Sequence, residues 1–302
     1  DQKAATATGV IKNVIQKYKI APEKIVAICA DNCATNYGSV HRTGPNNVFA
    51  LLKIEYGEDK LVGIGCLAHI IHNSLKEACN GTKTNVGKMI YKTEKYFAKE
   101  PVRVKNYTEL SLALGLGRNP DLPSSYVLTR WLSMKRALEK MIGSFRLLRS
   151  YFNSLTGKLS KDEQELKKFF NSQNVLPWLI VLYELAEEFE QTVISIEGDD
   201  ISLLSSIAKF DELKEKMRDR EISDVVNEHI DDLPNAQNFR HQVKQVYDNV
   251  FGYMESRSRW TASLKTLNWI NLDKELSVND ICTSAKILEN LGLILCDIVI
   301  KK

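Results

Sequence analysis

The chain has 302 residues, of which 44% are hydrophobic and 26% are charged, an ordinary composition for a globular protein. This length allows two domains and a sizeable core. No apolar run reaches the ~18–20 residues that a membrane span needs, and the first residues lack the apolar core of a secretory signal. We therefore expect no membrane partner. Because the chain begins with Asp and the helical pattern has already started there, we interpret it as a segment of a longer protein.

Six cysteines are spread along the chain without a C-x-x-C pair: Cys29, Cys33, Cys66, Cys79, Cys282 and Cys296. This spacing favours free thiols in a reducing compartment over a disulfide framework. The net charge is only +3, but residues 86–149 carry an excess of +8 and residues 161–236 an excess of −11. The two blocks indicate either surfaces with different partners or solvated helix faces that happen to differ.

The first half of the chain predicts alternating helices and strands. A first helix is indicated by apolar residues at helical spacing, namely Val10, Ile11, Val14, Ile15 and Tyr18. The apolar run 25–30, which lies between a proline and Asp31, predicts a short buried strand. A helix over 48–57, a second strand over 61–65 and a helix over 67–79 follow. The two strands are expected to be neighbours in one small sheet.

Beyond residue 80 the pattern is almost entirely helical. A basic helical stretch over 86–111 is interrupted at Pro101, and residues 114–125 form a loop by composition. A long amphipathic helix then carries an apolar face made of Leu138, Met141, Ile142, Phe145, Leu148 and Phe152. From residue 160 to residue 302 we expect almost only helices, with breaks at Pro177, at 197–200 and at 231–237.

Three short stretches are candidates for function. Asp31 and Asn32 stand at the end of the first strand, where α/β proteins often place functional groups, although Asx residues are also common turn formers. Cys66, His69 and His72 fall on one side of the next helix, which would suit zinc. Without a fourth ligand, a packed strand-helix junction with hydrogen-bonded imidazoles is the favoured interpretation, and no tightly bound zinc is expected.

Arg130 and Trp131, in "LTRWLS", form the third stretch. Arginine pairs with phosphate and tryptophan stacks on unpaired bases, whereas a core tryptophan beside a surface arginine is the simpler alternative. No phosphate-binding loop, nucleophile elbow, zinc-protease motif or dinucleotide fingerprint is present, which disfavours nucleotide-dependent enzymes, simple hydrolases and zinc proteases.

Taken together, the three stretches resemble the hAT superfamily of DNA transposases and host proteins derived from them. "ADNCATN" ends a strand, "CLAHIIHNSL" follows about 35 residues on, and "LTRWLS" about 60 further, in the order of the family motifs. Residues 1–155 carry the resemblance, and residues 156–302 are similar to the family's helical insertion. The resemblance implies an α/β and mostly α fold, with a partial RNase H-like core over 1–155 followed by an all-helical domain over 156–302.

In that family three acidic residues hold two magnesium ions that cut and join DNA. The resemblance places one acid on Asp31, with Asn32, Cys66 and His69 supporting the geometry. The first acid would lie upstream of residue 1, and Glu255 is the sole candidate for the third. Since two ions about 3.5–4 Å apart need converging carboxylates, we expect this segment alone to be inactive and to hold no cofactor. Magnesium belongs to a complete active form.

The resemblance also implies DNA as the partner and a nuclear location. Arg130 and Trp131 would accommodate an unpaired base, and Lys135 and Arg136 in the same basic block are expected to contact phosphates. The helical half is expected to bind protein partners or a second copy. We favour a domesticated, non-catalytic DNA-binding protein. The alternatives are a catalytic fragment of an active transposase and a helical scaffold unrelated to nucleic acid.

Overall fold

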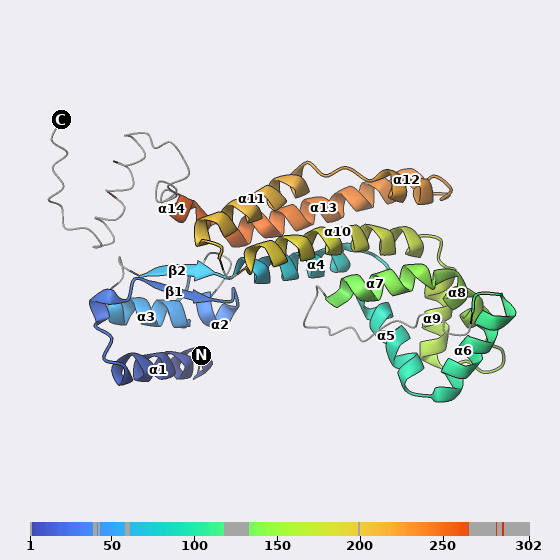
Figure 1. Ribbon diagram of the computed structural model, residues 1–302, viewed down its shortest axis with the longest axis horizontal. Coiled ribbons are helices and arrows are strands. Elements are labelled where there is room, and N and C mark those ends of the chain that lie inside the picture. The colour runs from blue at the N-terminus through green and yellow to red at the C-terminus, as the bar shows by residue number, and fades with distance from the viewer. Residues whose placement is uncertain are drawn as a thin grey trace. The chain divides into compact units, whose positions relative to one another are not determined.

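The computed structural model describes residues 2–38, 41, 43–57, 61–117, 133–198 and 200–265, together with residues 282 and 286. These residues form a mostly helical protein with one small parallel sheet of two strands (Figure 1). The prediction of a small sheet in a mostly helical chain is therefore confirmed. Within the described ranges, none of the helices combines the length and apolar character that a membrane crossing requires.

The described residues pack into two compact units. The first takes them from Asp1–Ile70, Ile196–Asp211 and Met254–Lys302, and the second from Ile71–Ser195 and Glu212–Tyr253. Four helices, α4, α10, α11 and α13, contribute residues to both. The predicted boundary between residues 155 and 156 was drawn from the family resemblance, which packing does not test, and it stays a prediction.

The first unit contains the sheet. Its elements are α1 (Gln2–Lys17), the 3-10 turn η1 (Pro22–Lys24), β1 (Ala27–Ala30), α2 (Ala34–Tyr37), α3 (Val48–Tyr56), β2 (Val62–Gly65), the start of α4 (Leu67–Gly81) and α14 (Thr261–Lys265). β1 and β2 are parallel, with Ala27 opposite Val62 and Ala30 opposite Gly65. The neighbouring strands predicted over 25–30 and 61–65 are thus confirmed, and their carboxyl ends meet at one edge.

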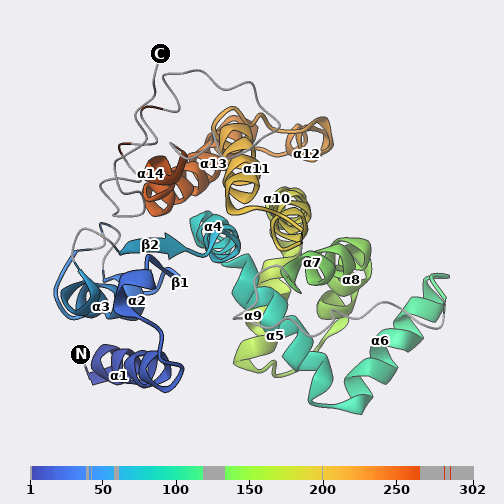
Figure 2. The ribbon, with the colours of Figure 1, turned by 60° about the vertical axis from the view of Figure 1, so that its left-hand side comes forward.

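Helices cover one face of the strand pair: α2 and α3 lie along it and α1 packs on α3 (Figures 1 and 2). Ala4, Val48, Leu52 and Leu61 are buried there, and Ile28 packs against them. The first strand was predicted to be buried, and this is wrong for the face of β1 that points away from these helices. Alternate side chains of a strand point to opposite sides, and Ala27 and Cys29 are exposed.

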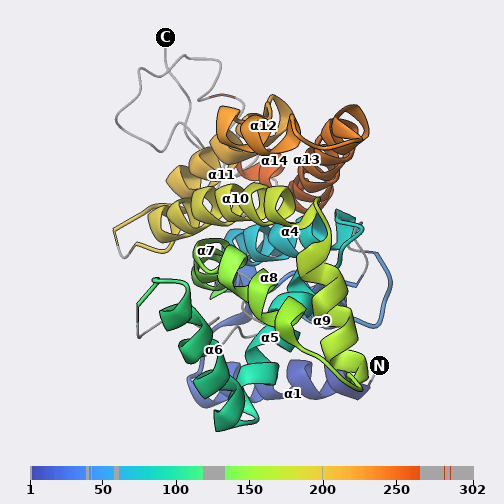
Figure 3. The ribbon, with the colours of Figure 1, turned by 90° about the vertical axis from the view of Figure 1, so that its right-hand side faces the viewer.

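The second unit is helical. Its elements are α5 (Val86–Ala98), α6 (Pro101–Ala113), α7 (Met134–Gly143), α8 (Phe145–Ser154), α9 (Lys161–Asn171) and α12 (Asp224–Ile230), with most of α4, α10 (Val175–Ile196), α11 (Leu203–Arg218) and α13 (Ala236–Ser258). Figure 3 shows α5 to α9 side by side. Pro101 begins α6 at a position where its missing N–H removes no helical bond, so the predicted break there is confirmed.

An aromatic core joins α5, α6, α8 and α9. Neighbouring ring centroids lie 5.0 to 6.2 Å apart across it, as aromatic pairs prefer, and its members are Tyr96, Phe97, Tyr107, Tyr151, Phe152 and Phe170. A capping box begins α9, because Ser160 and Glu163 each bond the other's backbone N–H. On α10, the buried ring of Trp178 packs 4.7 Å from that of Phe239 on α13.

Two predicted features of these helices are wrong. The single long helix ends at Gly143, and a new helix begins at Phe145 after a turn at Ser144. The apolar spacing continues across this turn, so the pattern did not reveal it. Pro177 does not break a helix either: it lies in the first turn of α10, where backbone N–H groups have no helical partner in any case.

Candidate functional site at the ends of the strands

Asp31 follows β1 directly and its side chain is exposed. Its Oδ1 accepts hydrogen bonds from the backbone N–H of Cys33, at 3.2 Å, and from Nδ2 of Asn36, at 2.7 Å. The first bond closes an Asx turn that leads the chain from the strand into α2. Both of these bonds go to Oδ1 and neither goes to Oδ2. Asp31 is therefore a turn former at the carboxyl end of the strand.

The environment of Asp31 favours its charged form. Hydrogen bonding by the side chain of Cys33 lowers the pKa of the Asp31 carboxyl most, and the bonds from the Cys33 backbone and from Asn36 lower it further. The charge of His69 on α4 contributes in the same direction, against a partial desolvation that raises the pKa. The carboxylate is thus ionised at neutral pH, as a cation ligand must be.

Asn32 joins the first two motifs in space. Its Nδ2 donates to the carbonyl oxygen of Cys66 at 2.9 Å, across 34 residues of sequence. The backbone N–H of Cys66 in turn donates to the carbonyl of Ala30 at 3.0 Å, which continues the parallel ladder to its carboxyl end. The end of β1 and the start of α4 are therefore held together.

Tyr37 and Asn36, both on α2, were missed by sequence reasoning. Tyr37 is 2% exposed, and its hydroxyl lies 3.1 Å from the carbonyl oxygen of Ile28 and 2.6 Å from that of Ile64. One hydroxyl thus ties α2 to both strands, while Asn36 holds the Asp31 carboxylate. No spacing rule singles these residues out, because the helix that carries them has only four residues.

Two thiols near the strand ends are held in their protonated form. Burial raises the pKa of Cys29 and that of Cys33, so both thiols stay protonated at neutral pH. Among the described residues no group of three or more His, Cys, Asp and Glu side chains could hold a metal ion. The absence of zinc at Cys66, His69 and His72 stays a prediction.

Magnesium takes about six oxygen ligands and, in a two-metal site, several converging carboxylates. Asp31 supplies a single carboxylate, and the turn already uses its Oδ1. Glu255 is exposed on α13 within the same unit as Asp31, yet it joins no metal-holding group of described residues. The donors of the described chain therefore do not by themselves fit a magnesium pair.

The predicted DNA-contacting residues fall into three groups. Arg130 and Trp131 lie outside the described residues. Lys135 is only 19% exposed and pairs with Glu190 at 2.9 Å and with Glu187 at 3.4 Å. The Glu190 pair, followed by Glu187, raises the pKa of the Lys135 ammonium. Arg136, the next residue, is exposed.

Comparison of the chain with protein-family models, with curated proteins and with solved structures finds no match. The interpretation of the site therefore depends on its own residues and on the motif resemblance.

Proposed function

We propose that the chain is part of a domesticated, transposase-derived protein that binds nucleic acid in the nucleus, built on a partial RNase H-like core with a helical insertion. The observation that supports this most is the hydrogen bond from Asn32 to Cys66. It brings two motifs of the resemblance together beside an ionised carboxylate at the carboxyl edge of parallel strands, where α/β proteins place ligands.

The same geometry argues against cleavage by this segment. The turn already uses Oδ1 of Asp31, and no other described carboxylate joins Asp31 in a metal-holding group. Strand cleavage with two metal ions needs more. Binding without cleavage is the function that the described residues support best.

Electrostatic attraction would supply the affinity. Duplex binding that neutralises phosphates releases counterions, so log K falls by roughly 0.9 per unit of log salt for each phosphate. A surface that uses about four to six cations of the block 86–149 gives a slope of about −4 to −5. Lys135 contributes little to this slope, because Glu187 and Glu190 already compensate its charge.

Fluorescence anisotropy with a labelled duplex over a range of salt concentrations tests the proposal. We expect weak, sequence-tolerant binding with the slope given above. Arg136→Ala should make the slope shallower by roughly 0.9, and the matched variant Lys135→Ala should change it much less. Trp131→Ala should weaken binding of DNA with an unpaired base by about 1–3 kcal/mol more than binding of plain duplex.

Two outcomes would change the conclusion. If no salt-dependent binding occurs at low ionic strength, the nucleic-acid function is wrong, and protein binding through the helical half becomes the better account. If magnesium or manganese supports nicking that Asp31→Asn abolishes, the chain belongs to an active transposase instead.

A further inference from the structure

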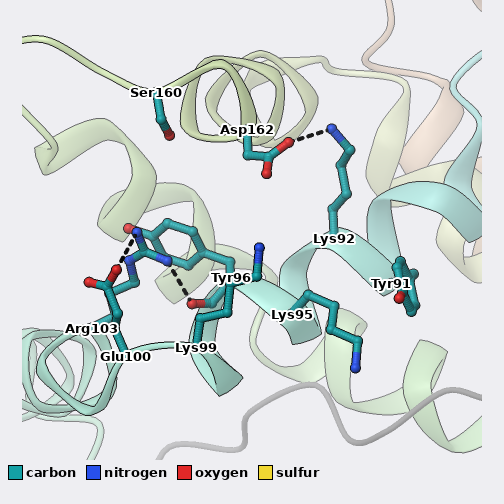
Figure 4. A pocket seen from close by; sticks show the side chains of 9 residues that line it. All are labelled: Tyr91, Lys92, Lys95, Tyr96, Lys99, Glu100, Arg103, Ser160 and Asp162. Carbon is teal, nitrogen blue, oxygen red and sulfur yellow. Dashed lines mark hydrogen bonds and ion pairs between the residues drawn. The ribbon is translucent and has the colours of Figure 1, made fainter.

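A pocket of about 490 Å³ in the second unit lies among α5, α6 and the start of α9. Four cations line it, Lys92, Lys95, Lys99 and Arg103, together with the rings of Tyr91 and Tyr96 (Figure 4). Its volume is within the range of roughly 300–1,000 Å³ that small-ligand sites occupy. Neither the strand-end site nor the motifs account for it.

Contacts within the protein already hold one wall of the pocket in place. The guanidinium of Arg103 lies 4.1 Å from the ring centroid of Tyr96, donates to the Tyr96 carbonyl oxygen at 3.0 Å, and pairs with Glu100 at 3.3 Å. The Tyr96 hydroxyl reaches Glu163 of the α9 capping box at 3.3 Å. These contacts join three helices, so a ligand does not have to order this wall.

Lys92 is already neutralised. Its ammonium lies 2.7 Å from a carboxylate oxygen of Asp162 and 2.6 Å from one of Glu165, and these two bonds raise its pKa. Figure 4 shows the side chain reaching up to Asp162. Lys92 thus fastens α5 to α9 and is not available to a ligand.

Lys95 and Lys99 are different. Both are exposed, Lys95 lies on α5 and Lys99 is the C-cap residue of that helix four positions on, and neither makes an ion pair within the described part of the chain. The Lys95 ammonium lies 5.4 Å from the ring centroid of Tyr91, which is half-buried. Two ammonium groups that make no described ion pair therefore stand at a preformed wall beside an aromatic ring, and the charge of Lys99 also acts on Asp162.

We propose that this pocket is a phosphate site, in which Lys95 and Lys99 bind a phosphodiester of single-stranded nucleic acid. Lysine binds phosphate as a point charge. An adjacent aromatic ring offers the stacking platform that single strands use, and Tyr91 supplies it. This identification of the ligand rests on the proposed nucleic-acid function, whereas free pyrophosphate would present the same chemistry to the same lysines.

The test compares two double variants of the full chain. Lys95→Ala with Lys99→Ala removes the two pocket ammonium groups. Lys76→Ala with Lys168→Ala is the matched control, since it removes the same charge from exposed helical positions of the same unit that do not line the pocket and make no ion pair within the described residues. A labelled single-stranded oligonucleotide is titrated at several salt concentrations, and thermal unfolding with and without pyrophosphate follows phosphate binding directly.

For single strands each phosphate contact contributes roughly 0.7 to the salt slope. Between ~1 M and ~0.1 M salt this slope corresponds to about 5-fold in affinity for one contact and about 25-fold for two. We expect the pocket variant to lose roughly this much affinity and to show a slope shallower by about 0.7 to 1.4. The control pair should retain most of its affinity. Pyrophosphate should raise the melting temperature of the wild type and the control pair only.

Equal losses in both double variants would overturn the pocket proposal and leave the nucleic-acid function standing. If the wild type binds no oligonucleotide, the nucleic-acid function is wrong, and thermal unfolding with pyrophosphate then tests whether the pocket binds phosphate at all. Stabilisation of the wild type but not of the pocket variant would then establish a site for free phosphate compounds. Stabilisation of neither would refute the phosphate site itself.

Discussion

The Tyr37 hydroxyl is the contact on which the strand-end geometry depends most directly. Tyr37→Phe keeps the buried ring and its packing 5.6 Å from Phe49, and removes only the hydroxyl that reaches the carbonyls of Ile28 and Ile64. The net contribution of such a hydrogen bond is about 0.5–1.5 kcal/mol. The strand pair should therefore open more readily by that amount.

Hydrogen exchange measures this opening locally, without requiring the two units to unfold together. The amides of Val62 and Cys66 bracket the pair, since they donate to Val26 at 2.9 Å and to Ala30 at 3.0 Å. Since about 1.4 kcal/mol corresponds to a factor of ten, their exchange should accelerate roughly two- to twelve-fold in Tyr37→Phe.

Two further variants frame this result. Tyr37→Ala also removes the ring and should cost on the order of 3–5 kcal/mol, as for other buried aromatic residues. Tyr18→Phe is the control, because Tyr18, directly after α1, is 67% exposed. If Tyr37→Phe exchanges like the wild type while Tyr37→Ala does not, ring packing alone holds α2 to the sheet and the reasoning from the hydroxyl is refuted.

Two other predictions concern single contacts. Asn36→Ala should raise the pKa of Asp31 toward its ordinary value, as NMR titration would measure. A depressed carboxyl pKa stabilises the fold at pH values above the unfolded pKa of ~3.9, and this stabilisation is lost as the pH falls through the folded pKa. The variant should therefore lose less stability on acidification than the wild type, and an unchanged Asp31 pKa would contradict the role of Asn36. A Cβ at Gly81 would lie 2.9 Å from Cγ2 of Val246, and such overpacking costs about 1–3 kcal/mol, more than the roughly 0.5–1 kcal/mol by which Ala stabilises a helix relative to Gly. In urea unfolding, Gly81→Ala should therefore destabilise the wild type but not a Val246→Ala background. Equal effects in both backgrounds would exclude the clash.

The sheet could be predicted because its signals are local. Each strand is a short apolar run, and a proline and Asp31 bound the first. The open face of β1 could not be predicted, because an apolar run does not say which side another element covers. Ala27 and Cys29 are apolar, yet they face away from the helices against which the partly buried Ile28 packs.

The sequence predicted the motif residues of the candidate site but not the residues of α2 that hold them in place. Asp31, Asn32 and Cys66 stand out by position, but the roles of Asn36 and Tyr37 follow only from the way α2 folds back on the strands. Counting charge along the sequence likewise cannot find ion pairs between distant residues.

Lys135 illustrates this limit and directs attention elsewhere in the basic block. Its partners, Glu187 and Glu190, lie on α10, more than fifty residues away in sequence. An excess of +8 over 86–149 therefore overstates the charge available to a ligand. Lys92 is compensated in the same way by Asp162 and Glu165.

What Asp31 can do follows from how its oxygens are used. Oδ1 accepts two hydrogen bonds within the turn, so a cation would approach the carboxylate on the side of Oδ2. Because magnesium takes about six oxygens, one such ligand cannot determine where the ion sits.

If the complete protein cuts DNA, further carboxylates must converge on the Asp31 carboxylate. Asp31→Asn should then abolish cleavage while leaving the salt slope of binding unchanged. The slope depends on cations such as Arg136, Lys95 and Lys99. The two measurements thus separate catalysis from binding, and a slope that changes with Asp31→Asn would show that the carboxylate itself lies in the nucleic-acid interface.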